Sequence, residues 1–144
     1  DFKYISSEMA ARYSNAPDYP EVAKHALAQM VKQTGDAKFD ERDMMKRGVI
    51  VRHLILPGHI KESKEAIRYL YETYGDQIYI SIMNQYTPMP GIEKRFKNLG
   101  RTITQKEYDE VVDYAIDLGV ENGFIQEGET AKESFIPQFD DTGL

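Results

Sequence analysis

The sequence predicts an α/β domain built on a parallel sheet, and three observations support this class. Two short runs have the continuous β-branched and aliphatic character of strands. Three longer segments repeat their apolar residues with the period of an α-helix. The two kinds of segment alternate along the chain, and strands that alternate with helices of this length form the βα units of a parallel sheet.

The first strong helix is predicted over Pro20–Thr34. Pro20 suits the first turn of a helix, and Gly35 suits its end. A shorter helix is predicted near Ser7–Tyr13. The apolar residues of the longer helix recur at spacings of three and four and share one face: Val22, Ala23, Ala26, Leu27, Met30 and Val31.

Two further helices follow the same pattern. One is predicted over Glu62–Tyr74 and is terminated by Gly75. The other begins with a capping box, in which the Thr104 oxygen and the Glu107 carboxylate each bind a free backbone amide, and it continues to Leu118. The acidic residues of this last helix, Glu107 among them, are interpreted as a solvated face.

The predicted strands are Gly48–Leu56, Ile78–Met83 and a short third strand at Gly123–Ile125. Gly48–Leu56 is nearly continuous in apolar residues, which is expected of a strand covered on both faces. A closed eight-unit barrel takes about 250 residues, so these units cannot close one. The chain is therefore either a small open α/β domain or part of a barrel.

The domain organisation is predicted as a body over residues 1–126 and a polar tail over 127–144, with Phe135–Pro137 and Phe139 able to pin the tail to the body. The loop Met89–Arg101 is longer than the usual βα connection, which is typical of functional loops. Because the chain begins without methionine, inside a phrase that reads like the end of a strand, we expect upstream sequence in the parent protein.

Composition restricts the function classes. The chain has 144 residues, 41% of them hydrophobic and 29% charged, as in globular domains. Its net charge of −6 argues against a nucleic-acid ligand. No run reaches the roughly 18 apolar residues of a membrane span. The absence of cysteine excludes disulfides, cysteine-bound zinc and any iron–sulfur cluster held within this chain, and a cytoplasmic location is expected.

Candidate binding residues lie where parallel strands end, because that edge carries the chemistry of such folds. Asp1 and Lys3 lie two residues apart, so their side chains point to the same side of an extended segment. Together they can bind the ammonium and carboxylate of a zwitterion. The alternative, and the commoner arrangement, is a solvated surface pair. Arg52 lies inside the apolar run and needs either a carboxylate partner or an anionic ligand. His53 faces the other way and is expected to pack with a hydrogen bond. His59 is either a ligand contact or an exposed loop residue.

The end of the second strand carries the sequence Asn84-Gln85-Tyr86. Amides and a phenol at this position suit hydrogen bonding or stacking with a heteroaromatic ring. The alternative is ordinary turn chemistry leading into Pro88.

Together these residues resemble a known family. Asp1-Phe2-Lys3 is similar to the Asp-Leu-Lys signature of the pyruvate formate-lyase activating enzyme group in the radical S-adenosylmethionine (SAM) superfamily. Val51–Gly58 resembles the group's strand with the pattern Arg-x-x-x-hydrophobic-Pro-Gly. The segments Ser14–Tyr19, Met83–Tyr86 and Tyr108–Glu127 are similar to a less characterised branch related to the activating enzyme. The resemblance covers essentially the whole chain.

The resemblance implies a partial (β/α)6 TIM-like barrel, of which this chain supplies units four to six. In that family a 4Fe–4S cluster on a Cys-x3-Cys-x2-Cys loop reduces SAM to a 5′-deoxyadenosyl radical. Asp1 and Lys3 match residues that hold the amino-acid end of SAM, and Asp1 also lies near a monovalent-cation site. Arg52 matches an arginine at the SAM site. Gln85 is assigned to the same cofactor-binding set, and Tyr86 stands where the activating enzyme has a histidine beside the adenine.

The implied partner is a glycyl-radical enzyme or another protein substrate, with no nucleic acid and no membrane. Without the cluster region, the chain alone is expected to be inactive. It is also expected to self-associate, because a half-barrel leaves a strand edge and an apolar sheet face uncovered. The alternative is a complete small α/β ligand-binding or interaction domain without catalysis.

Overall fold

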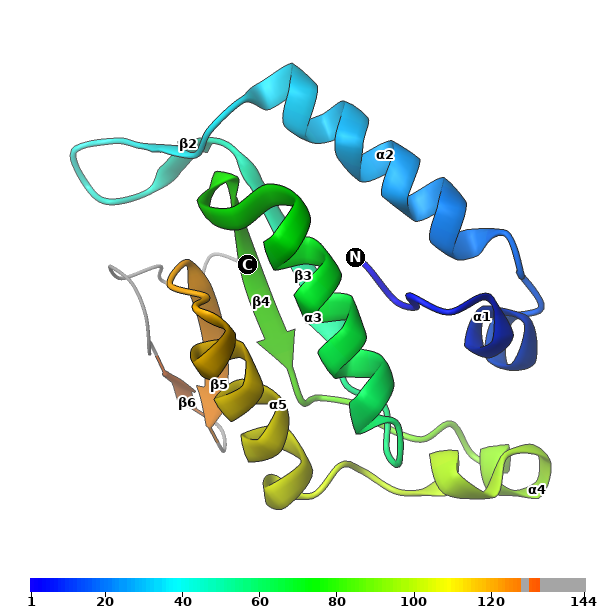
Figure 1. Cartoon of the computed structure of the whole chain (residues 1–144). Helices are drawn as coiled ribbons and strands as arrows, with labels where there is room; N and C mark the ends of the chain where they lie inside the picture. Colours follow the sequence, from blue (N-terminus) through cyan, green and yellow to red (C-terminus); the bar gives the residue numbers. More distant parts are fainter. Residues whose placement is uncertain (128–129, 133–144) are drawn as a thin grey trace.

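A computed structural model describes residues 1–127 and 130–132, and its centre is a four-stranded sheet (Figure 1). The strand order is β3-β4-β5-β6. The first three strands are mutually parallel, and β6 is antiparallel to β5. The predicted α/β class and parallel sheet are therefore confirmed. The strands are β3 (Val49–Leu54), β4 (Ile78–Met83), β5 (Gly123–Glu127) and β6 (Thr130–Lys132).

Each predicted helix is present with its ends close to those expected. A hairpin within residues 38–47, the short helix α4 and the strand β6 were not predicted, and Phe135–Pro137 and Phe139 of the tail lie outside the described residues. The capping box is confirmed: Thr104 Oγ1 accepts from the Glu107 amide at 3.1 Å, and Glu107 Oε1 accepts from the Thr104 amide at 2.9 Å. The helices are α1 (Ser7–Ser14), α2 (Tyr19–Thr34), α3 (Ile60–Tyr74), α4 (Ile92–Arg95) and α5 (Gln105–Leu118).

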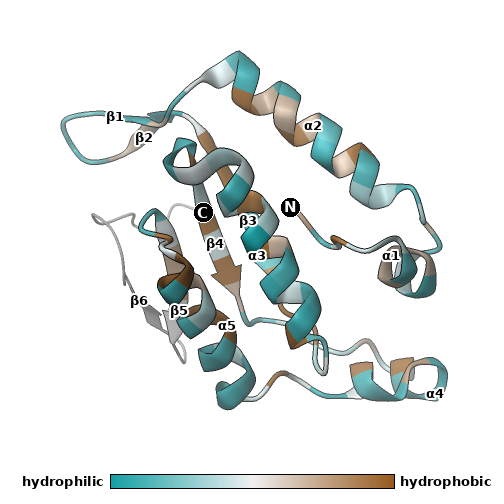
Figure 2. Ribbon diagram, viewed as in Figure 1, coloured by the Kyte–Doolittle hydropathy of each residue, from teal (hydrophilic) through white to brown (hydrophobic). Residues whose placement is uncertain are grey.

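The core lies between one face of the sheet and the helices α3 and α5, which run side by side across it (Figure 1). Side chains alternate along each strand, and those on this face are buried and, except for His53, apolar. Figure 2 shows the hydrophobic colour concentrated on β4 and on the inner sides of the helices. The buried residues of this face include Val49, Val51, Ile78, Ile80, Ile82, Ala66, Ile67, Leu70, Val111 and Ala115.

The opposite face of the sheet carries no described helix, and we call it the open face. Along β3 the even-numbered residues on this face are half-buried or exposed, whereas the odd-numbered ones are buried. The expectation that Gly48–Leu56 is covered on both faces is therefore wrong for the described part of the chain. A small antiparallel hairpin of β1 (Lys38–Phe39) and β2 (Met45–Arg47) covers the amino end of this face. There the rings of Phe39 and Tyr79 pack edge to face, with their centroids 5.4 Å apart.

His53 faces the helices and is fully buried, which confirms it as a hydrogen-bonded packing residue. Its Nδ1 lies 2.8 Å from the Phe2 carbonyl oxygen, and its Nε2 lies 2.8 Å from Ser63 Oγ. A carbonyl only accepts, so Nδ1 carries the proton and Nε2 accepts from the Ser63 hydroxyl. Burial lowers the pKa of His53, which favours this neutral form. One imidazole thus joins the N-terminal segment to α3.

We predict that Ser63→Ala lowers the free energy of unfolding by about 1–3 kcal/mol, because it leaves the buried Nε2 of His53 without a donor. Urea unfolding followed by far-UV circular dichroism measures this. Ser81→Ala, on the open face, is the matched control and should change the free energy by no more than about 0.5 kcal/mol. Equal effects of the two variants would contradict the buried hydrogen bond.

Candidate ligand-binding site at the carboxyl end of the sheet

The N-terminal segment lies along the free edge of β3. The Phe2 amide donates to the Arg52 carbonyl at 2.8 Å, and the Phe2 ring is buried in the core, stacked on Tyr69. The hydroxyl of Tyr19 fixes the neighbouring backbone, since it accepts from the Lys3 amide at 3.0 Å and donates to the Asp1 carbonyl at 3.1 Å. Because side chains alternate along extended backbone, Asp1 and Lys3 belong to the side of the open face.

This placement brings Asp1 and Arg52 together. Arg52 Nε donates to Asp1 Oδ1 at 2.7 Å, and the two side chains are 54% and 49% exposed. The expected carboxylate partner of Arg52 is thus found, but the expected burial of Arg52 is wrong, since the open face leaves the guanidinium in water. An exposed pair of this kind contributes about 0–1 kcal/mol to stability, so stability alone is a weak reason for it.

The surroundings of this pair are cationic. Lys3, two residues from Asp1 on the same side, adds an exposed ammonium group to the guanidinium of Arg52. Among the described residues, the Asp1 carboxylate binds only the Nε–H of Arg52, and the guanidinium keeps its other donors for a second partner. A carboxylate, a guanidinium and an exposed ammonium at one place offer the contacts that the ammonium and carboxylate of an amino acid need.

Tyr86 and Gln85 are not brought into contact with this pair. The Tyr86 hydroxyl donates to the Leu99 carbonyl at 2.8 Å, which ties the end of β4 to the following loop. Burial raises the pKa of Tyr86, and the nearby hydroxyls of Tyr13 and Tyr4 add to this. Gln85 is exposed, with no hydrogen bond in the described part of the structure. Of the five predicted binding residues, the geometry therefore joins Asp1 and Arg52 and places Lys3 beside them.

His59 belongs to a polar cluster that sequence reasoning did not find. Its Nε2 lies 2.6 Å from the Tyr13 hydroxyl and 2.9 Å from Asn98 Nδ2. Burial and the charge of Arg12 lower the pKa of His59, which favours the neutral ring. Because the Asn98 Nδ2 group only donates, Nε2 is the acceptor nitrogen of this ring. His59 is thus neither a lone exposed residue nor free for a ligand. Tyr13 and Asn98 come from distant segments, and no local pattern marks them.

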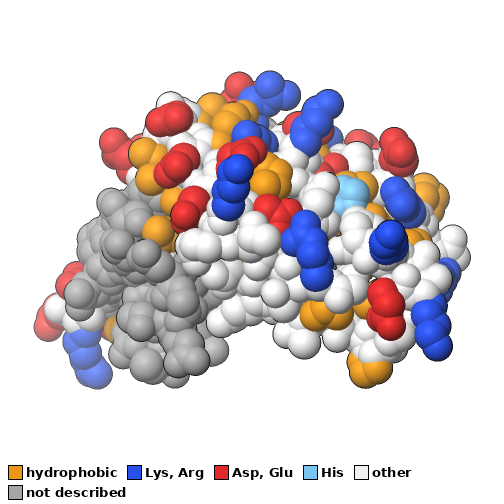
Figure 3. Space-filling model, turned by 90° about the horizontal axis from the view of Figure 1, so that it is seen from below, with side chains coloured by type: hydrophobic (Ala, Val, Ile, Leu, Met, Phe, Trp, Pro, Cys, Tyr) orange, Lys and Arg blue, Asp and Glu red, His pale blue; other side chains and the backbone are white. Residues whose placement is uncertain are grey.

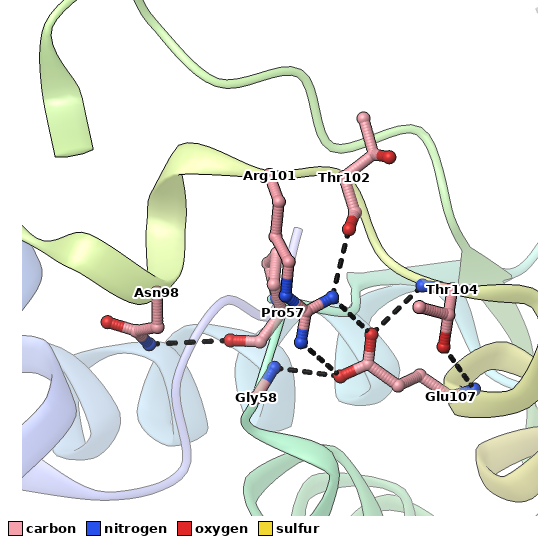
Figure 4. Close-up of polar contacts among 7 residues, drawn as sticks. All are labelled: Pro57, Gly58, Asn98, Arg101, Thr102, Thr104 and Glu107. Atoms are coloured by element: carbon pink, nitrogen blue, oxygen red, sulfur yellow. Dashed lines mark hydrogen bonds and ion pairs between the residues drawn. The ribbon is translucent and has the colours of Figure 1, made fainter.

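A second network fastens the long βα loop to the end of β3 (Figure 4). The Glu107 carboxylate receives two hydrogen bonds from Arg101, at 2.7 and 3.0 Å, and one from the Gly58 amide at 2.9 Å. Its side chain is only 13% exposed, so the interpretation of Glu107 as part of a solvated face is wrong. The hydrogen bonds from Arg101, followed by those from the amides of Thr104 and Gly58, lower its pKa from 4.5 to about 2.

Figure 3 views the molecule from the end to which β4 points, where the loops 55–59 and 84–104 lie. Acidic and basic side chains are intermixed over this face rather than separated into large patches. A ligand at this end meets charges of both signs, which suits a small molecule of mixed charge better than a polyanion.

A scan against models of protein families, a search of curated proteins and a search of solved structures each found no match to this chain. None of the described helices is long and apolar enough to cross a membrane. Within residues 1–127 and 130–132, no three acidic or histidine side chains are grouped so that they can hold a metal ion.

We predict that Glu107→Gln destabilises the chain by about 1–2 kcal/mol near neutral pH, since the amide turns an acceptor into a donor that faces Arg101 or a backbone N–H. The lowered pKa sets the pH window: the carboxylate contributes fully above pH 4.5, and its contribution is lost as the pH falls towards about 2. Urea unfolding at several pH values measures this.

The control for this pH series is Glu110→Gln, because Glu110 forms only a half-exposed pair with Lys64 at 2.9 Å. Its effect should stay below about 1 kcal/mol. If the difference in free energy of unfolding between wild type and Glu107→Gln does not become smaller in acid, the charge of Glu107 is not what holds the loop.

Proposed function

We propose that this chain is the SAM-binding half of a radical SAM enzyme that resembles the pyruvate formate-lyase activating enzymes and acts in the cytoplasm. The observation that carries the proposal is the meeting of Asp1 and Arg52, at 2.7 Å, on the open face of a parallel sheet. Lys3 lies two residues from Asp1 on the same side. The resemblance assigns Asp1 and Lys3 to the amino-acid end of SAM and Arg52 to the SAM site, and the charges of these three residues match the carboxylate and ammonium of SAM.

The two cofactors fit this chain differently. The Asp1 carboxylate, as an acceptor, and the donors of Lys3 and Arg52 suit the amino-acid end of SAM. The 4Fe–4S cluster needs thiolate ligands, and the chain contains no cysteine. In the proposal, the Cys-x3-Cys-x2-Cys loop lies elsewhere in the parent protein, and this chain alone is inactive. The open face would then line the lumen of a (β/α)6 barrel, and the partner would be a glycyl-radical enzyme or another protein substrate.

The second candidate is a complete small α/β ligand-binding or interaction domain without catalysis. One observation favours it: Asp1 already gives Arg52 a partner, so the pair requires no ligand. The two candidates differ in what Arg52 does. In the first it binds the carboxylate of SAM, and in the second it only balances Asp1.

A SAM titration followed by ¹H–¹⁵N NMR separates the two candidates. We predict that millimolar SAM shifts the amide signals of Lys3 and Arg52, and that Arg52→Gln weakens binding at least about tenfold, because a charge-assisted hydrogen bond contributes about 1.5–3 kcal/mol. Arg68→Gln is the matched control, since Arg68 is an exposed arginine on α3. No shift at Lys3 and Arg52, or equal binding by the two variants, would favour the non-catalytic domain.

We also propose that the chain self-associates through its open face. Ile50, Leu54 and Met83 are half-buried there, and a few hundred Å² of apolar surface corresponds to several kcal/mol at about 25 cal/mol per Å². Sedimentation velocity at micromolar concentration should show a dimer, which Leu54→Glu converts to a monomer. Ile116→Glu, on exposed α5 surface, should leave the dimer intact. A monomeric wild-type chain would contradict the proposal.

A further inference from the structure

The outer side of the N-terminal segment is bound by one side chain, that of Tyr19. On the inner side, the Phe2 amide donates to the Arg52 carbonyl of β3 at 2.8 Å. Because neighbouring residues of an extended segment turn their N–H and C=O groups to opposite sides, the Asp1 carbonyl and the Lys3 amide point away from β3. The Tyr19 hydroxyl binds both, since it accepts from Lys3 at 3.0 Å and donates to Asp1 at 3.1 Å. In the part of the chain that the structure describes, this hydroxyl is their only hydrogen-bond partner.

The Tyr19 hydroxyl is itself held in a fixed position. Tyr19 is half-buried, and its ring packs edge to face with the ring of Tyr4, with their centroids 5.7 Å apart. Tyr4 is buried, and its hydroxyl lies 2.8 Å from Ser14 Oγ. The backbone of Tyr19 is fixed as well, because its amide donates to the Ala16 carbonyl at 2.9 Å where α2 begins. A tyrosine side chain has only two rotatable angles, so these contacts determine where its hydroxyl lies.

The later part of the N-terminal segment is held without Tyr19. The carboxylate of Glu62, a buried residue of α3, accepts from the Ile5 amide at 2.6 Å and from the Ser6 amide at 3.0 Å. These two hydrogen bonds attach the segment to α3 before α1 begins. Loss of the Tyr19 hydroxyl should therefore loosen only the first three residues and leave the rest of the fold intact.

The two residues that Tyr19 fixes are charged members of the candidate site. Asp1 and Lys3 are both exposed, so packing does not order them. The ion pair of Asp1 with Arg52 is exposed too, and such a pair contributes less than the ordering of one residue's backbone costs. The Tyr19 hydroxyl supplies the additional restraint before a ligand arrives. A site whose groups are already ordered binds more tightly, because less conformational freedom is lost on binding.

We infer that Tyr19 is a positioning residue of the candidate site: its hydroxyl orders the backbone of Asp1 and Lys3, so that their carboxylate and ammonium groups are pre-arranged for the amino-acid end of a ligand. Tyr19 acts through these two residues and contacts no ligand itself. The inference rests on the proposed function for the identity of the ligand, SAM. It adds a residue to which neither the sequence pattern nor the resemblance gives a role.

The experiment measures SAM binding to the full 144-residue chain and to its Tyr19→Phe variant by ¹H–¹⁵N NMR titration. The variant keeps the ring and removes the hydroxyl. It should weaken SAM binding about fivefold, which corresponds to the loss of one ordinary hydrogen bond. Tyr13→Phe is the matched control, because it removes a hydroxyl that lies 2.6 Å from His59 Nε2 and has no hydrogen bond to Asp1 or Lys3 in the described structure. It should change the dissociation constant of SAM by less than about twofold.

A double-mutant cycle separates positioning from a general effect on the fold. Lys3 is exposed, so Lys3→Ala should fold normally. In this background Tyr19→Phe should weaken SAM binding by only about twofold, because one of the two side chains through which Tyr19 acts has been removed. Equal losses in the two backgrounds, or a Tyr19→Phe chain that binds SAM as tightly as wild type, would overturn the inference and leave the proposed function in place. A wild-type chain that does not bind SAM would overturn both.

Discussion

The position of Phe2 beside β3 is the constraint on which the other features of this chain depend. It is held by its amide on the Arg52 carbonyl, by its carbonyl on the buried His53, and by its ring in the core. These contacts fix the position of the N-terminal segment along β3 and determine which of its side chains face the core. Because neighbouring side chains alternate, the same contacts put Asp1 on the open face, where it meets Arg52.

The carboxyl end of the sheet is held by a different kind of interaction. There the loops after β3 and β4 are joined through side chains rather than through a backbone ladder. Glu107 binds Arg101 and the Gly58 amide, and Asn98 binds both His59 and the Pro57 carbonyl. The loop of residues 84–104 is therefore fastened at several separate points. The loops that follow β3 and β4 are therefore held in place near the Asp1–Arg52 pair.

The helices and main strands were predictable because their signals are local. Capping residues, terminal glycines and the apolar period lie within each segment, as at Thr104 and Gly119 of α5. The hairpin of β1 and β2 was not predictable, because strands of two and three mostly polar residues carry no period. The exposure of Arg52 was also missed, since an apolar run shows that a strand is present but not what covers each of its faces.

In the candidate site, too, residues with a local sequence signal were predicted, whereas contacts between distant segments were not. Asp1, Lys3 and Arg52 were found because each departs from its local pattern or lies where a strand ends. The roles of Glu107 and His59 depend on partners such as Arg101, Tyr13 and Asn98, which reach them through loop packing. A capping signal at Glu107 predicted one of its hydrogen bonds, to the Thr104 amide, but not the two from Arg101 or the one from Gly58.

The strength of the charge interactions at Arg52 and Lys3 depends on whether the open face is in water or covered. With water on this face, Arg52 and Lys3 attract a ligand carboxylate only weakly, since two charges about 4 Å apart interact by about 1 kcal/mol in water. Covering the face lowers the local dielectric response and raises that attraction to about 4 kcal/mol near a protein surface. It also increases the cost of leaving either cation unpaired. Under the proposed function, a cover over Ile50 and Leu54 and a zwitterion beside Arg52 therefore favour each other, and each should bind more tightly when the other is present.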